Sequence, residues 1–420
     1  MRPFFTIWTG QSLSLIGSQA VQFALIWWLT ERTGSAAVLA LAAFVGLFPT
    51  VAFGPFIGAL IDRWNRKTIM LLADAGVAVT SVALALLFAA GLADTTTVIV
   101  ALFLRAVGGA FHQPAMAAST TLMVPEEHLT RIQGMNQALL GGLNIVAAPL
   151  GALLWAVLPI AGVMLVDVGS AFVAIVPLLF VQVPQPSRTQ DQNGESSTSY
   201  LAEIRDGFRY LRQRAGHMGL LALGAMINLF LVPAFALLPL LVSGQLGGDA
   251  MQLGWMNSGL GVGMFGGGIV LGVWGGFKRR MLTTLTGLAA LGVVVFVLGS
   301  TPSGSPSGHA IGVMFVLGAL VPLVNGPIQA ILQATVAPGF QGRVFTLYGS
   351  IAGATTPIGL ALAAPVAQLA GVRAWYWAGG IGCVCAAVAG LLIPAVLHLE
   401  DREQAFTGNS VREVVVDPGR

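Results

Sequence analysis

Twelve apolar segments of membrane-spanning length follow one another along this chain of 420 residues, and they constrain its fold more than any other feature. A run of about 20 apolar residues can cross the hydrocarbon core of a bilayer as a helix. The segments lie near residues 5–29, 37–60, 69–91, 95–117, 132–156, 161–182, 217–242, 252–275, 281–299, 309–332, 344–369 and 373–397. Because a helix satisfies its own backbone polar groups inside lipid, the sequence predicts an all-α membrane protein with 12 transmembrane helices.

The composition supports a lipid environment rather than water or nucleic acid. Hydrophobic residues make up 56% of the chain and charged residues only 9%, whereas soluble domains average about 25% charged residues. The net charge of +3 comes from basic residues in loops, which the positive-inside rule explains better than nucleic-acid binding does. Cys383 and Cys385 point to different helix faces, so we expect neither a disulfide nor a metal site. No cofactor is expected.

The order of the segments divides the chain into two halves around one long polar insert. Leu201, Ile204, Phe208 and Leu211 repeat at helical spacing in that insert, which predicts an amphipathic helix on the membrane surface. The predicted parts are an N-terminal six-helix half (1–183), a cytoplasmic linker with this helix (184–214), a C-terminal six-helix half (215–398) and a cytoplasmic tail (399–420).

The two halves also resemble each other in sequence. Pro114 and Pro327 are 213 residues apart, and Arg66 is followed 214 residues later by Arg280. Matching positions at a nearly constant offset are typical of a duplicated six-helix unit, as in transporters with two halves around a central pathway.

The basic residues of the short loops give the orientation. With the N-terminus in the cytoplasm, nine basic residues lie inside and only Arg32 and Arg373 lie outside. The nine are Arg2, Arg63, Arg66, Lys67, Arg131, Lys278, Arg279, Arg280 and Arg343. We therefore expect a multi-pass protein of the cell membrane with both termini in the cytoplasm.

The loop between the second and third segments is unusually charged. Its sequence, residues 58–67, is G-A-L-I-D-R-W-N-R-K. Gly58 lets another backbone approach closely, Asp62 can lie against a helix N-terminus, and Arg63, Arg66 and Lys67 anchor the loop in the cytoplasm. The pattern G-x-x-x-D-R-x-x-R-K resembles the signature that major facilitator transporters have between their second and third helices.

Several other stretches extend this resemblance to the macrolide-efflux branch of the drug-exporting major facilitators. They are residues 7–14 (I-W-T-G-Q-S-L-S), 29–35 (L-T-E-R-T-G-S), 111–115 (F-H-Q-P-A), 124–127 (V-P-E-E) and 342–347 (G-R-V-F-T-L). The resemblance implies the major facilitator fold of two six-helix halves and an export direction. Several members of the branch have an acid where Ser18 stands in this chain. Siderophore exporters share much of the pattern, so the substrate stays open.

Three charged side chains lie clearly within the predicted spans, where charge is costly and usually functional: Asp74, Arg105 and Asp167. Arg105 and Asp167 lie at similar depths from the outside, so we expect them to pair, either as a structural ion pair or with a role in proton coupling. Asp74 is expected to hold the charged loop through Arg66 or another nearby cation, and the alternative is a direct role in transport. His112 lies on nearly the same helix face as Arg105 and is either a proton relay or a hydrogen-bonded helix-end residue.

Two stripes of neutral polar residues are candidates for the substrate cavity. Their spacing of three or four residues keeps each stripe on one helix face. The stripes are Gln11, Ser14, Ser18 and Gln22 in the first span, and Asn325, Gln329 and Gln333 in the tenth. Such residues can alternatively bond neighbouring helices. A wide, mostly apolar cavity suits a bulky amphipathic drug better than a sugar or a phosphate.

Small residues and prolines predict how some helices pack. Gly259, Gly263 and Gly267 form a ridge of small residues in the eighth span, which predicts close approach of another helix. Pro149 and Pro357 are expected to loosen the fifth and eleventh spans where the two halves rock.

The sequence contains no H-E-x-x-H motif, no Cys/His cluster and no P-loop, so neither an enzyme nor a directly ATP-driven pump is expected. The predicted function is a monomeric secondary exporter of small amphipathic compounds such as macrolides, by alternating access and proton antiport. In this hypothesis Asp62 and the basic residues beside it are a latch that stabilises the outward-facing state. The alternative is an exporter of a siderophore, another endogenous metabolite or a lipid.

Overall fold

The computed structural model describes residues 2–184, 215–336, 341–397 and 399, and this part of the chain is helical without any strand. Twelve of its helices are long and apolar enough to cross a membrane, which confirms the predicted fold class. The amphipathic helix predicted in the linker, and the tail 400–420, lie outside the described residues.

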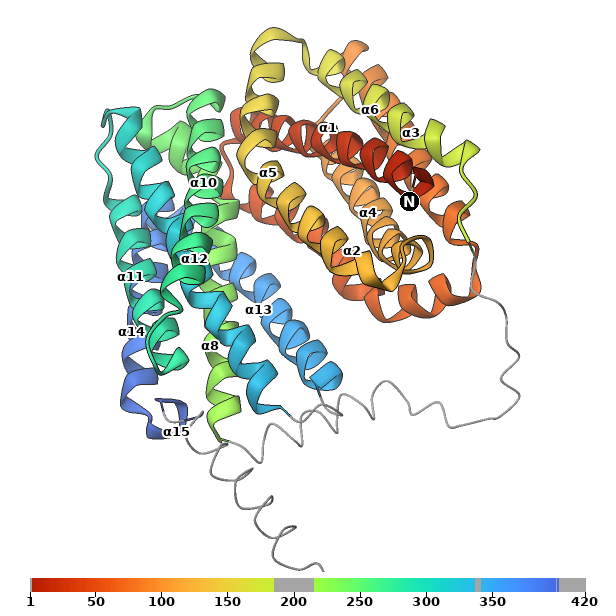
Figure 1. Ribbon diagram of the computed structural model, residues 1–420. Coiled ribbons are helices and arrows are strands. Elements are labelled where there is room, and N and C mark those ends of the chain that lie inside the picture. Colours follow the sequence, from red (N-terminus) through yellow and green to blue (C-terminus); the bar gives the residue numbers. More distant parts are fainter. Residues whose placement is uncertain (1, 185–214, 337–340, 398, 400–420) are drawn as a thin grey trace, which may run out of the picture.

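The helices form two groups that lie side by side (Figure 1). The first half consists of α1 (Arg2–Thr33), α2 (Ala36–Arg63), α3 (Arg66–Ala89), α4 (Thr95–Met123), α5 (Glu126–Val157) and α6 (Ile160–Phe180). The second half consists of α8 (Ala215–Ala236), α9 (Leu238–Leu240), the π-helical turn η1 (Leu241–Leu246), α10 (Ala250–Trp274), α11 (Arg280–Ser300), α12 (Ser307–Thr335), α13 (Gln341–Ala370), α14 (Val372–Leu392) and α15 (Pro394–Leu397). Several helices are longer than the predicted spans because they continue beyond their apolar stretches.

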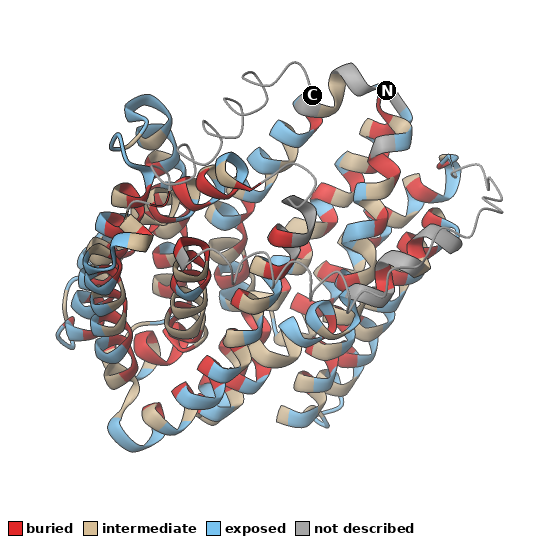
Figure 2. Ribbon diagram, turned by 90° about the horizontal axis from the view of Figure 1, so that it is seen from below, coloured by how far each residue is buried: buried red, intermediate tan, exposed pale blue. Residues whose placement is uncertain are grey.

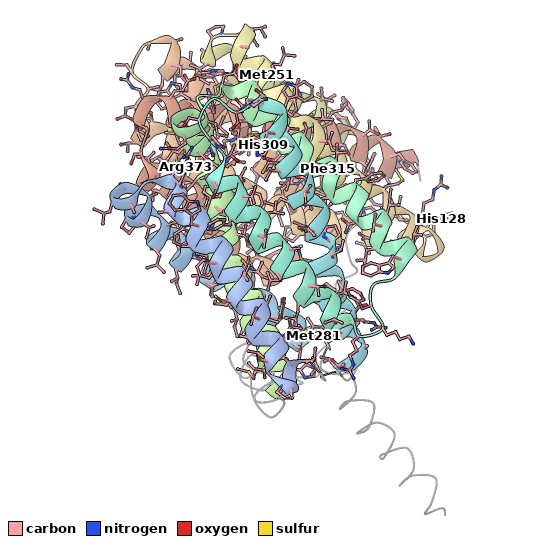
Figure 3. The ribbon with its side chains drawn as sticks, turned by 90° about the vertical axis from the view of Figure 1, so that its left-hand side faces the viewer. His128, Met251, Met281, His309, Phe315 and Arg373 are labelled. Atoms are coloured by element: carbon pink, nitrogen blue, oxygen red, sulfur yellow. The ribbon has the colours of Figure 1, made fainter. Side chains whose placement is uncertain are left out.

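The bundle has two ends, which we name from the loops of the first half. At the charged-loop end, Trp64 and Asn65 connect α2 to α3; at the opposite end, Gly34 and Ser35 connect α1 to α2. In the second half, α11 begins at the charged-loop end, near Met281, and Arg373 lies towards the other end (Figure 3).

Short, well-capped connections fix the opposite end. Asp94 accepts a hydrogen bond from the backbone of Thr97, and the Thr97 hydroxyl bonds the backbone N–H of Asp94 in return, which completes a capping box at the start of α4. The hydrogen bonds from Thr97 hold the pKa of Asp94 below its usual range. Arg373 donates to the carbonyl oxygen of Thr301 at 2.8 Å and so joins the start of α14 to the end of α11.

Among the residues that the structure describes, the hydrophobic core is shared between the halves at the opposite end. The largest cluster of buried residues contains first-half residues from that end, such as Leu25, Leu39 and Ala152, together with residues of the second half. At its charged-loop end the first half has separate clusters, around Met70 and around Ile132. Figure 2 shows buried residues on the helix faces that meet other helices. The halves are therefore packed together at the opposite end.

The glycine ridge of α10 lies directly against α12. A Cβ on Gly263 would collide with the carbonyl oxygen of Phe315, and a Cβ on Gly267 would collide with that of Ala319. Gly259 approaches the same helix one turn earlier. The close packing predicted from these small residues is confirmed.

Two arginines related by the sequence repeat make the same kind of contact in their own halves. Arg66 donates to the carbonyl oxygen of Ala118 in α4 at 2.6 Å. Arg280 donates to the carbonyl oxygen of Ala330 in α12 at 3.3 Å. The offsets of 214 and 212 residues agree with the repeat found in the sequence.

Candidate functional site

A cavity of about 430 Å³ lies inside the first half, between α1, α3, α4 and α5. We call it the first cavity. Its polar lining includes the predicted stripe of Gln11, Ser14, Ser18 and Gln22, together with Asp74, Arg105 and His112. The helical spacing of the stripe explains why one face of α1 supplies four of these residues.

Arg105 of α4, which lines the first cavity, forms an ion pair with Asp167 of α6. The sequence predicted this pairing. Asp167 is fully buried, and it also accepts hydrogen bonds from Ser18 at 2.7 Å and from Ser81 at 2.5 Å. Arg105 donates further to Ser81 at 2.8 Å and to the backbone carbonyl of Ser18 at 3.2 Å. Four helices are joined through this cluster.

The cluster also places a carboxylate beside Ser18 of α1, which is not itself an acid. Ser18 occupies the position where the family resemblance implies an acid, and its hydroxyl donates directly to the carboxylate of Asp167. The carboxylate at this place in the bundle therefore comes from α6 instead of α1. Arg105 and the hydroxyls of Ser18 and Ser81 are therefore its hydrogen-bond partners inside the bundle.

Asp74 has different partners from those the sequence predicted. Its carboxylate accepts a hydrogen bond from Gln11 at 2.8 Å and lies 3.5 Å from Nε2 of His112. The expected contact with Arg66 is wrong, because Asp74 lies two turns further along α3, on a face that meets α1 and α4. His112 is also not a helix-end residue, since α4 continues to Met123.

Sequence reasoning missed several polar residues of this site. Trp8 donates to Oδ1 of Asn136 at 2.8 Å, and both residues line the first cavity. Ser81 was missed because nothing in its sequence context separates it from a serine that bonds its own helix. Its seven-residue spacing from Asp74 was the available signal.

The polar stripe of the tenth predicted span does not join the first cavity. Within the described part of the chain, Asn325, Gln329 and Gln333 are exposed on one face of α12 and lie outside the cavity lining. The structure therefore brings together the candidates of α1, α3, α4 and α6, and it leaves those of α12 apart.

The charged loop holds the ends of neighbouring helices in the first half. Asn65 caps α3 by accepting from the backbone of Thr68 at 3.3 Å. Lys67 donates to the carbonyl oxygens of Leu179 and Val181 at 2.8 and 2.9 Å, where α6 ends. Gly58, Asp62 and Arg63 belong to α2; their side chains lie outside the described part of the structure.

No group of three or more metal-ligating side chains occurs among the residues that the structure describes. The polar lining of the first cavity consists of Arg105, the neighbouring Asp74 and His112, and several amides and hydroxyls, and the other walls are apolar.

Comparison with known proteins places these features in a family. Residues 7–354 and 235–415 match the model of the Major Facilitator Superfamily. Macrolide efflux protein A from Streptococcus pyogenes is 34% identical over 399 residues, which are 94% of this chain and 97% of that relative. Multidrug efflux pump Tap from Mycobacterium tuberculosis is 27% identical over 421 residues, covering 96% of both chains.

Solved structures agree in fold at low sequence identity. A bacterial homologue of the iron transporter ferroportin, in an inward-facing state, superposes with a TM-score of 0.70 and 15% identity, covering 92% of this chain and 97% of that one. The nucleoside transporter NupG superposes with a TM-score of 0.63 and 11% identity, covering 92% and 98%.

Proposed function

Because the chain belongs to the Major Facilitator Superfamily, we propose that it exports hydrophobic and amphipathic drugs, macrolides first among them, by alternating access and proton antiport. As a member of this family it is a multi-pass membrane transporter and not an enzyme. The observation that most supports drug export is the match to macrolide efflux protein A, which extends over 97% of that relative.

The arrangement of the core supports alternating access. In the described part of the chain, the buried core that the two halves share lies at the opposite end, around Leu25 and Ala152. The positive-inside rule assigns the charged-loop end, and both termini with it, to the cytoplasm. In this proposal the structure corresponds to the state that receives substrate from the cytoplasm, and rocking of the halves opens the other end.

Proton coupling is assigned to Asp74 and His112. Both line the first cavity, and their carboxylate and imidazole groups lie 3.5 Å apart, so a proton can be exchanged between them and water in the cavity. Histidine is the side chain whose charge changes most readily near neutral pH. Asp167 is the weaker candidate because Arg105 and two hydroxyls already satisfy its charge.

The first cavity also suits an amphipathic substrate. Leu15, Leu102 and Met116 contribute apolar wall beside the amides of Gln11 and Gln22. Ligand pockets of this kind bind apolar compounds and use a few polar groups for orientation.

The test is uptake of a labelled macrolide by inverted vesicles that contain the protein. We expect accumulation when the proton gradient is present, and loss of accumulation when a protonophore collapses it. Accumulation that persists without the gradient would contradict proton antiport. No accumulation by correctly inserted protein would contradict macrolide export and favour a siderophore, another metabolite or a lipid as substrate.

A further inference from the structure

The loop that joins α10 to α11 combines exposed aromatic rings with exposed cations. The ring of Trp274, at the end of α10, packs edge-on against that of Phe277 in the loop, with 4.9 Å between the ring centroids. Trp274 is 47% exposed and Phe277 is 43% exposed. The exposed residues that follow directly are Lys278, Arg279 and Arg280. Partly exposed aromatic rings beside cations are typical of the level of the lipid headgroups.

The backbone fixes the shape of this loop. Gly275 and Gly276 have φ values of 76° and 82°, a left-handed conformation that other residues rarely adopt. The N–H of Phe277 donates to the hydroxyl of Thr283 in α11 at 2.8 Å. The turn therefore holds the aromatic pair and the cations after it close to one another, near Met281 at the charged-loop end (Figure 3).

The second half supplies no negative charge at this end. Between residues 215 and 397 the sequence contains a single acid, Asp249. Asp249 caps the other end of α10, and at 1.5 Å per residue the 25 residues of that helix place it about 37 Å from the loop. This separation is several times the screening length of about 8 Å at physiological ionic strength. The loop is therefore a positive patch that fits an anionic partner.

An apolar face of α10 leads up to the loop. Phe265, Ile269 and Val273 are spaced four residues apart, so they lie on one helix face, and they are 66%, 53% and 85% exposed. Phe265 lies two residues from Gly263 and from Gly267, so this face is opposite to the glycine ridge that packs against α12. A partner with a negative headgroup and apolar chains fits both the loop and the face below it.

We propose that this loop and the adjoining face of α10 bind an anionic phospholipid, with Lys278 and Arg279 at its phosphate group and its acyl chains along Ile269 and Val273. The rings of Trp274 and Phe277 then lie at the level of its glycerol backbone. The positive-inside rule assigns the charged-loop end to the cytoplasm, so the lipid belongs to the inner leaflet, where anionic lipids attract basic segments. This inference is independent of what the protein transports.

The experiment cross-links the full chain to lipid from the loop itself. Phe277 is replaced by the photoreactive analogue p-benzoylphenylalanine, in protein reconstituted into vesicles of phosphatidylglycerol and excess phosphatidylcholine with the same acyl chains. Mass spectrometry of the adducts gives the ratio of the two lipids beside the loop. We expect phosphatidylglycerol to be enriched about tenfold or more over the bulk ratio, because each basic residue near the surface favours an anionic lipid about fivefold.

Removing the charges should remove this preference. Lys278→Gln should lower the enrichment about fivefold, and Lys278→Gln combined with Arg279→Gln should bring the ratio close to that of the bulk. Lys278→Arg keeps the charge and should keep the enrichment. Arg280 is left in place because it bonds Ala330 of α12.

Phe180 is the matched control position for the cross-linker. It is 84% exposed at the charged-loop end of α6, where Lys67 is already bonded to the carbonyl oxygens of Leu179 and Val181. The same replacement at Phe180 should give adducts close to the bulk lipid ratio in every variant. The yield of those adducts also shows whether each variant is inserted.

Four results would overturn the inference. Three are a bulk lipid ratio at Phe277, the same enrichment at Phe180 as at Phe277, and an enrichment that Lys278→Gln with Arg279→Gln leaves unchanged. The fourth is cross-linking of Phe277 to another part of the chain in place of lipid, because the protein itself would then cover the patch.

Discussion

The hydroxyl of Ser258 in α10 donates a hydrogen bond to the backbone carbonyl of Ile145 in α5, across the boundary between the two halves. Pro149, four residues after Ile145, has no N–H, so this carbonyl lacks its usual helical donor. The helices are packed tightly here, and a Cβ on Gly254 would lie 3.1 Å from Cα of Pro149. Because an unpaired carbonyl is costly at membrane depth, the bond stabilises the closed arrangement at the opposite end.

Ser258→Ala should therefore favour opening at that end. Loss of one neutral hydrogen bond is worth about 1 kcal/mol, which corresponds to about a fivefold shift in population. Spin labels at the exposed positions Leu153 of α5 and Trp255 of α10 allow the distance distribution to be measured by electron paramagnetic resonance. We expect a larger fraction of long distances in the variant.

Pro149→Ala supplies the missing N–H to Ile145 and so provides a double-mutant cycle. In the Pro149→Ala background, the population shift caused by Ser258→Ala should be less than half of that in the natural background. Ser119→Ala is the matched control, since Ser119 is also buried but its described hydrogen bond lies within its own helix, to Ala115. Equal effects of Ser258→Ala with and without Pro149 would contradict the role of the freed carbonyl.

Asp167→Asn should strongly destabilise the first half, because it leaves the charge of Arg105 buried without its counter-ion. Breaking a buried pair in this way typically costs about 3–5 kcal/mol. The measurement is thermal unfolding of the detergent-purified protein, followed through its tryptophan fluorescence. Replacing both residues, as Asp167→Asn with Arg105→Gln, should restore part of the lost stability because no charge then stays buried.

Asp74→Asn is the control for the ion pair, since it makes the same chemical change at a carboxylate whose partners are Gln11 and His112. It should unfold close to the natural protein. A double variant less stable than Asp167→Asn alone would show that the pair contributes through some other contact.

Features of this site that depend on position along a single helix could be predicted from the sequence, whereas features that depend on how helices are rotated against each other could not. Helical spacing predicted that Ser14 and Ser18 share a face, and similar depth predicted the pairing of Arg105 with Asp167; both are local or one-dimensional properties of helices. The contact between Asp74 and His112 depends on how α3 and α4 are rotated against each other, which tertiary packing decides.

The polar stripe of α12 shows what helical spacing cannot predict. The spacing of Asn325 and Gln329 predicts a common face, and both are exposed on α12. Spacing within one helix contains no information about how far apart the halves stand, so it could not predict that this face lies outside the first cavity.

Asp74→Asn should uncouple transport from the proton gradient while the protein stays folded. Without the carboxylate, His112 loses its described acidic neighbour within 4 Å, and the pair can no longer pass a proton between a carboxylate and an imidazole. We expect gradient-driven macrolide uptake in inverted vesicles to fall about tenfold or more, within the range of general acid–base contributions. Macrolide binding at equilibrium should persist. Gradient-driven uptake at the natural rate would contradict the coupling role.

Two glycines of α10 allow the role of the glycine ridge to be tested, because replacing either one by valine changes the helix propensity equally. Gly263→Val places a branched side chain against the carbonyl of Phe315, whereas Gly266 has no atom within 4 Å of an added Cβ. Overpacking should cost Gly263→Val about 1–3 kcal/mol of stability, and Gly266→Val should unfold like the natural protein. The measurement is thermal unfolding of the two variants in the same detergent. Equal losses of stability would contradict the role of the ridge in packing against α12.

Asp62→Asn tests the latch at the charged-loop end. The loop already joins helices of the first half, since Arg66 bonds Ala118 and Lys67 bonds the end of α6. In the latch hypothesis Asp62 adds a charged hydrogen bond to the second half in the outward-facing state. Loss of such a bond costs about 1.5–3 kcal/mol, enough to slow transport about tenfold. Membrane insertion should be unchanged. Asp94→Asn is the control, because asparagine caps α4 about as well as aspartate, and its transport should match the natural protein. A transport rate for Asp62→Asn equal to that of this control would contradict the latch.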